Sequence, residues 1–187
     1  MKKINKLLIT TLLDSKVIGD EDIELYEYGI IILEKKLIFF CVYFILSIWW
    51  GNMLCGMVSL ICFIIMRRHM GGLHFINAYL CFGFSLFSLL VCSMMAKYSC
   101  IDENIYRLLY FISNSILIVI GPVDCENKRI CHDEKKYYYK MGVIILAVLS
   151  SLVVVMLLVG WGEIEKAIEG SVILVALTTC IAKLKNG

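Results

Sequence analysis

Two histidines and a cysteine stand close together in residues 67–81, RRHMGGLHFINAYLC, a short polar segment between two apolar runs. A thiol becomes a strong nucleophile when a neighbouring group takes its proton or stabilises the thiolate. Histidine can do either near neutral pH. His74 and Cys81 therefore predict a nucleophile and its base, provided that the fold brings the two side chains together.

The spacing of seven residues between His74 and Cys81 sets a geometric condition. On one continuous helix the two side chains would share a face but lie about 10 Å apart along the axis, too far for direct proton transfer. Gly71 and Gly72 can give His74 a non-helical backbone that folds back toward Cys81. If Asn77 caps the next helix, Cys81 falls near its first turn, where unpaired N–H groups and the helix dipole favour a negative sulfur or an oxyanion.

Other interpretations of these residues stay open. In a membrane chain with nine cysteines, an interfacial histidine and a packed thiol also explain the pattern. His69 could be the base instead, or His69 and His74 could bind a metal with Cys81. A zinc site needs three or four strong ligands, and no strong ligand besides these three residues is near in the sequence. The sequence therefore predicts no metal and no cofactor.

The elements that must position these residues are membrane helices. The 187 residues are 60% hydrophobic and their mean hydropathy is +0.84, whereas a typical soluble domain is about half apolar. One proline, no internal repeat and no low-complexity tail favour a single membrane domain over residues 1–187. The irregularly spaced cysteines indicate small apolar packing residues rather than a disulfide framework.

Residues 1–36 predict amphipathic helices that lie on the membrane surface. Ile4, Leu7 and Leu8 share one helical face beside several lysines, which is typical of an interfacial helix. The acidic residues at 20–22 suit the start of a second helix, because negative charge is favourable at a helix N-terminus. Charged residues then keep this helix out of the lipid.

Residues 37–66 carry no charge. One helix over this length would measure roughly 45 Å, more than the ~30 Å hydrocarbon core of a bilayer. Gly51 and Asn52 offer a turn in the middle. We therefore favour a hairpin of two short spans over one long helix.

Four further apolar runs follow, at about 80–96, 105–121, 141–160 and 168–182. With the hairpin they give an all-α, polytopic membrane protein of about six transmembrane helices, a bundle over residues 37–182. Every Lys and Arg then falls on one side except Lys97, Arg107 and Lys166. This positive-inside bias predicts cytoplasmic termini and a cytoplasmic 67–81 segment.

Basic residues beside the candidate nucleophile could bind a substrate. Arg67 and Arg68 either anchor their segment at the lipid headgroups or hold a substrate carboxylate, and both roles are compatible. We predict both arginines as substrate-binding residues, together with Gly72.

A second basic stretch, residues 122–140, reads PVDCENKRICHDEKKYYYK. Its Lys135 and Lys136 precede three tyrosines, a pattern typical of a cytoplasmic membrane anchor. We also predict that both lysines contribute to substrate binding. A metal site is the weaker interpretation of this stretch, with Cys125, Cys131 and His132 as its ligands.

The order of these motifs resembles that of the accessory gene regulator B (AgrB) family, bacterial processors of quorum-sensing peptides. RRHMGGLHFINAYLC is followed by PVDCENKRI and EKKYYYK and is preceded by ELYEYGIIILEKK. The resemblance covers nearly the whole chain, and RR-x-x-G-G-x-H-x6-C is its most specific part. It implies a multi-pass protein of the bacterial cell membrane that acts on a small amphipathic, AgrD-like propeptide. It also suggests a homodimer, and no nucleic-acid partner is expected.

Carried onto this sequence, the resemblance implies a cysteine endopeptidase in which Cys81 is the nucleophile and His74 the general base, with Arg67 and Gly72 at motif positions around them. Cys81 would cleave the propeptide near its C-terminal end and hold the remainder as an acyl-thioester. An internal thiol or hydroxyl would then close a thiolactone or lactone ring. The segment has no acidic residue to orient His74, so we expect a Cys-His dyad. The alternative from another functional class is a non-enzymatic membrane peptide exporter or scaffold.

Overall fold

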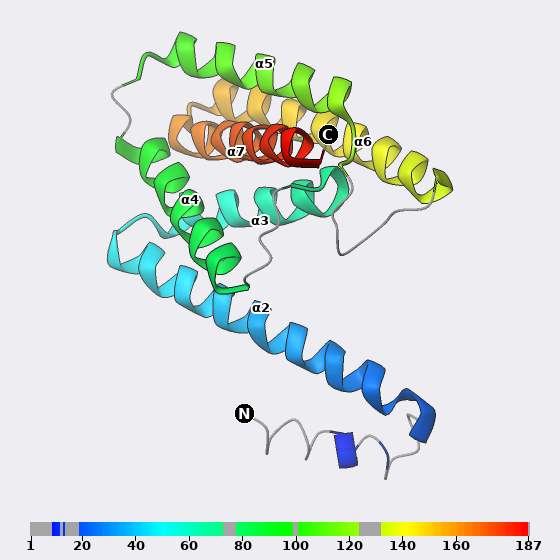
Figure 1. Cartoon of the computed structure of the whole chain (residues 1–187). Coiled ribbons are helices and arrows are strands. Elements are labelled where there is room, and N and C mark those ends of the chain that lie inside the picture. The colour runs from blue at the N-terminus through cyan, green and yellow to red at the C-terminus, as the bar shows by residue number, and fades with distance from the viewer. Residues whose placement is uncertain are drawn as a thin grey trace. The chain divides into compact units, whose positions relative to one another are not determined.

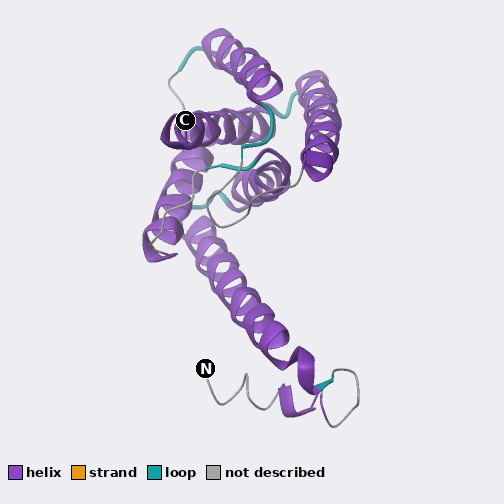
Figure 2. Ribbon diagram, turned by 45° about the vertical axis from the view of Figure 1, so that its right-hand side comes forward, coloured by secondary structure: helices purple, strands orange, loops and turns teal. Residues whose placement is uncertain are grey.

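The computed structural model describes residues 9–11, 13, 19–72, 78–98, 101–123 and 132–186. In this part of the chain every regular element is a helix, which confirms the predicted all-α fold (Figures 1 and 2). The elements are η1 (Asp20–Asp22), α2 (Ile23–Trp49), α3 (Met53–Met70), α4 (Ala78–Tyr98), α5 (Glu103–Ile120), α6 (His132–Val159) and α7 (Gly162–Asn186). The chain forms two compact units, residues 1–45 and residues 46–187.

The first unit contains η1 and most of α2. Residues 9–11 and 13 are helical. The second predicted helix begins at the acidic residues, as predicted, with a hydrogen bond from the Asp22 N–H to the Gly19 carbonyl (3.1 Å). α2 then continues through Glu34, Lys35 and Lys36 without a break. The predicted border between the interfacial helices (1–36) and the membrane bundle (from 37) is therefore not a helix boundary. Glu and Lys are good helix formers, and their charge opposes burial in lipid without opposing the helix itself.

A turn separates α2 from α3 where the sequence predicted one. The Gly51 N–H donates to the Ile48 carbonyl (2.9 Å) and the Asn52 N–H to the Ser47 carbonyl (3.0 Å). Residues 37–66 are therefore not one continuous helix.

Five described helices, α3 to α7, are long and apolar enough to cross a membrane, where the sequence predicted about six. The expected first span is the end of α2. Its uncharged residues 37–49 would cover only about 20 Å, and the charges at 34–36 adjoin them. The multi-pass architecture is confirmed with one candidate span fewer.

α7 is the central helix of the second unit. It contacts α3, α4, α5 and α6, and it lies between α5 and α3 in Figure 1. Ala167, Ser171, Val175 and Thr179 recur every four residues, and all four are buried. A face of such small side chains lets neighbouring helices approach closely. The Ser171 hydroxyl accordingly lies 3.2 Å from the Ser59 carbonyl of α3, to which it donates.

Local chemistry fixes both ends of α5. At its start the Asp102 carboxylate accepts a hydrogen bond from the Asn104 N–H (2.7 Å), a typical N-cap. At its end Gly121 adopts a φ of 67° and donates its N–H to the Leu117 carbonyl (3.0 Å). The single proline of the chain, Pro122, follows and cannot continue the helix.

Two polar stretches that the sequence predicted as connections are partly helical. α6 begins at His132, inside the stretch 122–140, and α7 begins at Gly162 rather than near 168. Hydropathy marks where a helix can lie in lipid, not where the helix itself begins. The 28 residues of α6 span about 42 Å, so its first turns, with Lys135 and Lys136, exceed a ~30 Å hydrocarbon core.

The second unit has two chemically different ends. At the Cys81 end, the last turn of α3 meets the first turn of α4, and the Val123 N–H donates to the Met70 carbonyl (3.3 Å). At the Arg107 end, the starts of α5 and α7 are joined by Arg107 and Glu165. Lys97, near the end of α4, donates there to the Gly51 carbonyl that precedes α3.

Candidate active site

Cys81 lies in the first turn of α4, which begins at Ala78. This position agrees with the prediction, and the Cys81 side chain is half-buried. The first N–H groups of a helix have no acceptor within that helix, and together with the dipole they favour negative charge beside them. The sulfur of Cys81 is therefore close to a region that can stabilise an anion.

Arg67 reaches across from the last turn of α3 to α4. Its Nη2 atom lies 3.8 Å from the Cys81 sulfur, and its Nη1 donates to the Ser85 hydroxyl at 2.8 Å. Cys81 and Ser85 are one helical turn apart and so share a face. The Phe63 ring lies one turn before Arg67, with its centroid 5.4 Å from the guanidinium carbon. A positive charge thus lies beside the thiol, an arrangement that stabilises a thiolate.

Gly71 ends α3 at a point where no side chain fits. Its φ is 77°, its N–H donates to the Arg67 carbonyl (3.1 Å), and a Cβ there would lie 2.6 Å from the Val123 carbonyl oxygen. Because Val123 also donates its N–H to Met70, the segment after α5 is bound to the end of α3. The first glycine of the pair therefore permits this close backbone contact.

Gly72, predicted from the motif, is buried against the arginine and α7. A Cβ at this position would lie 3.6 Å from Arg67 Nε and 3.4 Å from the Thr178 hydroxyl oxygen. The structure thus brings together three of the predicted site residues: Arg67, Gly72 and Cys81. Gly72 lines the arginine side chain rather than an open surface.

His74 falls in residues 73–77, outside the described part of the chain, as does the expected helix cap Asn77. Cys125 and Cys131 are outside it too, and the side chain of His132 is not described. The Cys-His dyad therefore stays a prediction. Among the described residues, no group of three His, Cys, Asp or Glu side chains could hold a metal ion.

The alternative base, His69, is directed away from Cys81. Its Nδ1 lies 2.9 Å from the Ile65 carbonyl of its own helix, and its ring centroid is 6.1 Å from that of Tyr138 in α6. Residues two apart on a helix point to different sides. His69 accordingly faces α6, whereas Arg67 faces α4.

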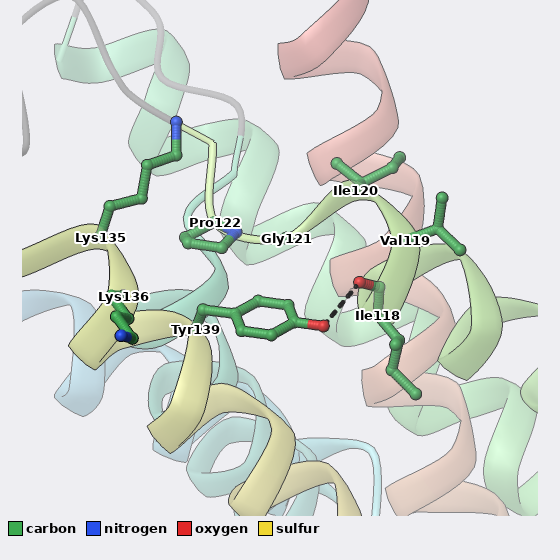
Figure 3. Close-up of a pocket in the computed structure, with 8 residues that line it drawn as sticks. All are labelled: Ile118, Val119, Ile120, Gly121, Pro122, Lys135, Lys136 and Tyr139. Carbon is green, nitrogen blue, oxygen red and sulfur yellow. Dashed lines mark hydrogen bonds between the residues drawn. The ribbon is translucent and has the colours of Figure 1, made fainter. Parts of the chain in front are cut away.

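The two predicted lysines line a pocket of about 390 Å³ between the end of α5 and the start of α6 (Figure 3). In Figure 3, Tyr139 reaches across the pocket and donates its hydroxyl hydrogen to the Ile118 carbonyl (3.2 Å). The lining residues are Ile118, Val119, Ile120, Gly121, Pro122, Lys135, Lys136 and Tyr139. Pro122 of this lining is followed in the chain by Val123, whose N–H donates a hydrogen bond to the Met70 carbonyl at the end of α3. Arg68, the remaining predicted residue, is exposed.

Sequence reasoning missed several residues that build the site. Ser85 carried a usable signal, since it follows Cys81 by one helical turn. Gly71 was considered only for the flexibility of the pair, although its contact with Val123 is the tighter one. Thr178 had no signal near the motif, because α7 brings it to Gly72 from more than one hundred positions later in the chain.

Comparison with known proteins gives one family match. The sequence model described as AgrB, accessory gene regulator B, matches residues 2–182 and so covers every described helix for all or most of its length. No curated protein and no solved structure matches the chain.

Proposed function

The chain belongs to the accessory gene regulator B family, and from that premise we propose that it is a membrane-embedded cysteine endopeptidase with Cys81 as its nucleophile. Membership of this peptidase family implies a role in processing an AgrD-like propeptide. The observation that best supports Cys81 is the Arg67 guanidinium, 3.8 Å from its sulfur at the start of α4. An inert packed thiol would have no need of a half-buried cation beside it.

In the first step of the proposed reaction, the Cys81 thiolate attacks a carbonyl carbon near the C-terminal end of the propeptide. A carbon–sulfur bond forms and the carbonyl π electrons move to oxygen, giving an oxyanion. The oxyanion collapses, the carbon–nitrogen bond breaks, and His74, which had taken the thiol proton, gives it to the departing amine. The rest of the propeptide stays on Cys81 as a thioester.

In the second step an internal thiol or hydroxyl of the bound peptide loses its proton to His74 and attacks the thioester carbonyl. The new bond closes a thiolactone or lactone ring, and the bond to Cys81 breaks so that its sulfur leaves as a thiolate. A thioester retains the acyl reactivity that this transfer needs, whereas attack by water would lose it. Exclusion of water by the surrounding helices therefore favours the ring.

Arg67 supports both steps in this proposal. Its charge favours the thiolate before attack and again when Cys81 departs in the second step. Because the guanidinium already contacts Ser85 and Phe63, little reorganisation is needed when charge develops at the sulfur. We propose a role at the sulfur for Arg67, rather than the binding of a distant substrate carboxylate.

The pocket at Lys135 and Lys136 is the proposed contact for the acidic groups of the propeptide. Two ammonium groups beside an apolar wall suit an amphipathic peptide that presents carboxylates. The backbone path from Pro122 through Val123 to Met70 links this pocket to the end of α3 that carries Arg67. Arg68, the residue after Arg67, is exposed and is a second candidate for contacts with the acidic groups of the propeptide.

We infer that the Cys81 end faces the cytoplasm, where a newly made propeptide would meet it. The last turn of α3 has two arginines, the start of α6 has three lysines, and the last turn of α7 has Lys183 and Lys185. Cytoplasmic ends of membrane helices are enriched in such residues. A fluorescent protein fused after residue 187 should therefore fluoresce, and a periplasmic or extracellular reporter fused there should be inactive. Signal from the second reporter alone would contradict this orientation.

The homodimer suggested by the resemblance is part of the same proposal. Native mass spectrometry in detergent should give twice the chain mass of 21.4 kDa. A mass of one chain under conditions that support cleavage would contradict the dimer.

The experiment that tests the proposed function is co-expression with candidate propeptides from the same genome, followed by mass analysis of the peptides. Cys81→Ala and His74→Ala should abolish cleavage, while Cys180→Ala, which removes another half-buried thiol, should retain it. Membrane insertion of all three variants is the control. Normal cleavage by Cys81→Ala would refute the proposal, and peptide transport without cleavage would favour an exporter or scaffold.

A further inference from the structure

Ser85 is a buried residue whose hydroxyl contacts the same guanidinium as the proposed nucleophile. Its side chain belongs to a residue only 6% exposed, one turn after Cys81 on the same face of α4. Many buried helical serines return their hydroxyl to a carbonyl of their own helix. The Ser85 oxygen instead accepts a hydrogen bond at 2.8 Å from Nη1 of Arg67, which comes from another helix.

This hydrogen bond fixes the orientation of a long side chain. Arginine loses considerable rotamer freedom on ordering, so its position depends on the partners that hold it. The guanidinium is rigid and planar, so its two terminal nitrogens keep a fixed separation. A hydrogen bond that holds Nη1 at Ser85 therefore restricts the positions that Nη2 can take. Nη2 is the atom that lies 3.8 Å from the Cys81 sulfur.

Two further neighbours of Arg67, Phe63 and Gly72, restrict its side chain without fixing its rotation. The Phe63 ring attracts the guanidinium at 5.4 Å, but a ring face specifies no particular rotation about its normal. Gly72 packs beside the Nε atom and the Cγ carbon of the side chain, nearer its stem than its two terminal nitrogens. Of these three contacts only the bond to Ser85 sets which terminal nitrogen meets the sulfur.

We propose that Ser85 is a positioning residue, which holds the Arg67 guanidinium against Cys81 and thereby raises the reactivity of the thiol. The inference rests on the proposed function, because it assumes that the Cys81 thiolate is used. Ser85 makes no contact with the reacting atoms in this account and acts only through Arg67.

The test measures thiol reactivity directly and needs no propeptide. The purified full-length protein in detergent is treated with iodoacetamide at fixed pH, and peptide mapping follows alkylation of Cys81 over time. Ser85→Ala should slow this alkylation about three- to tenfold, because a hydrogen bond to a charged group is lost and the arginine is less well fixed. Ser85→Thr keeps a hydroxyl and should restore most of the rate.

Ser93→Ala is the matched control. Ser93 lies in the same helix and is 2% exposed, but its hydroxyl donates to the Leu90 carbonyl of α4 itself at 3.0 Å. Removing it deletes the same atom from an equally buried site without affecting Arg67. Alkylation of Cys81 should proceed at the wild-type rate in this variant.

A double-mutant cycle separates positioning from a general loosening of α4. In an Arg67→Ala background Ser85→Ala should cause no further loss, because Ser85 has nothing left to position. Equal alkylation rates in wild type and Ser85→Ala, or the same fold loss in both backgrounds, would overturn the inference.

The outcome also separates this inference from the proposed function. If the Ser85 variants behave as expected but no propeptide is ever cleaved, the positioning role stands and the peptidase proposal fails. If cleavage depends on Cys81 but Ser85→Ala reacts like wild type, the peptidase proposal stands and the positioning role fails.

Discussion

The two ends of the second unit use the same residue type in opposite ways. At the Arg107 end, Arg107 Nε lies 3.0 Å from a Glu165 carboxylate oxygen, and Glu165 is almost buried. At the Cys81 end, Arg67 is directed at a hydroxyl and a thiol. A carboxylate neutralises the charge of its arginine, whereas a thiol leaves that charge to act on the sulfur. One end is thus held together by ion pairs, and at the other a positive charge lies beside the thiol that the proposed reaction uses.

The surroundings of the two arginines follow the same division. Lys166 lies 3.1 Å from Glu103, which also faces Arg107 at 3.7 Å, so opposite charges alternate at the Arg107 end. Asn52 adds a hydrogen bond to the Ser93 carbonyl there. The Cys81 end has exposed lysines around a pocket instead.

The largest expected effect is that of Arg67→Ala on the proposed chemistry. Loss of the charge beside Cys81 should slow formation of the acyl-thioester by two to three orders of magnitude, about 3–4 kcal/mol in activation free energy. Single-turnover mass spectrometry with propeptide measures that rate. Arg67→Lys should recover little, since an ammonium lacks the planar fork that reaches Ser85 and Cys81 together. Full activity of Arg67→Ala would contradict a role for the Arg67 charge at Cys81.

Arg107→Ala should have the complementary effect, on stability rather than on chemistry. It leaves Glu165 nearly buried without its nearest cation, and Arg107 is about one-third exposed, so we expect a loss of about 2–3 kcal/mol in the free energy of unfolding. Unfolding in a graded denaturant, monitored in lipid or mild detergent, measures it. Glu103→Gln, at a more exposed partner, should cost less than 1 kcal/mol. A slower thioester step in folded Arg107→Ala would contradict the division between the two ends.

Gly71→Ala should damage the Cys81 end through its backbone. A methyl group would clash with the Val123 carbonyl oxygen, and alanine at a φ of 77° costs roughly 1–2 kcal/mol. We expect about tenfold slower cleavage. We also expect the free energy of unfolding to fall by at least the roughly 1–2 kcal/mol that the backbone conformation costs alanine. Gly83→Ala in α4 is the control, because no atom lies within 4 Å of its added methyl group and alanine favours a helix. Equal behaviour of the two variants would show that the contact with Val123 is unimportant.

The smallest expected effect belongs to the exposed lysines. Replacing Lys135 and Lys136 by Gln should weaken propeptide binding about two- to fivefold each, because exposed charge pairs contribute little. The difference from wild type should shrink as salt rises, since screening removes the interaction in both. Binding of labelled propeptide to Cys81→Ala protein at several ionic strengths measures this. A salt-independent loss would place the lysines in a structural role.

The sequence predicted those features that depend on local pattern. Hydropathy located the membrane helices, Gly51 and Asn52 marked a real turn, and Cys81 falls in a first helical turn as expected. Helix boundaries were predicted less well. α3 extends beyond the apolar run, through Arg67 and Arg68 of the polar segment to Met70, because a polar residue outside the lipid can remain helical.

Contacts between distant segments were beyond the sequence. The approach of Val123 to Gly71 and of Thr178 to Gly72 depends on how the helices pack, which no periodicity within one helix can reveal. The choice between a substrate-binding and a sulfur-facing Arg67 depends likewise on the position of α4. The motif named candidate residues, and the fold brings Arg67, Gly72 and Cys81 of that set together.

The most direct test of the central claim is the intact mass of the protein after incubation with a candidate propeptide, for wild type and Cys81→Ser. The wild type should gain a covalent adduct equal in mass to the propeptide without its C-terminal fragment, and a small thiol should remove it. Cys81→Ser should bind the propeptide without forming that labile adduct. Cleavage of the propeptide by Cys81→Ser at the wild-type rate, or a thiol-labile adduct of the same mass on Cys81→Ser, would contradict an acyl-thioester on Cys81.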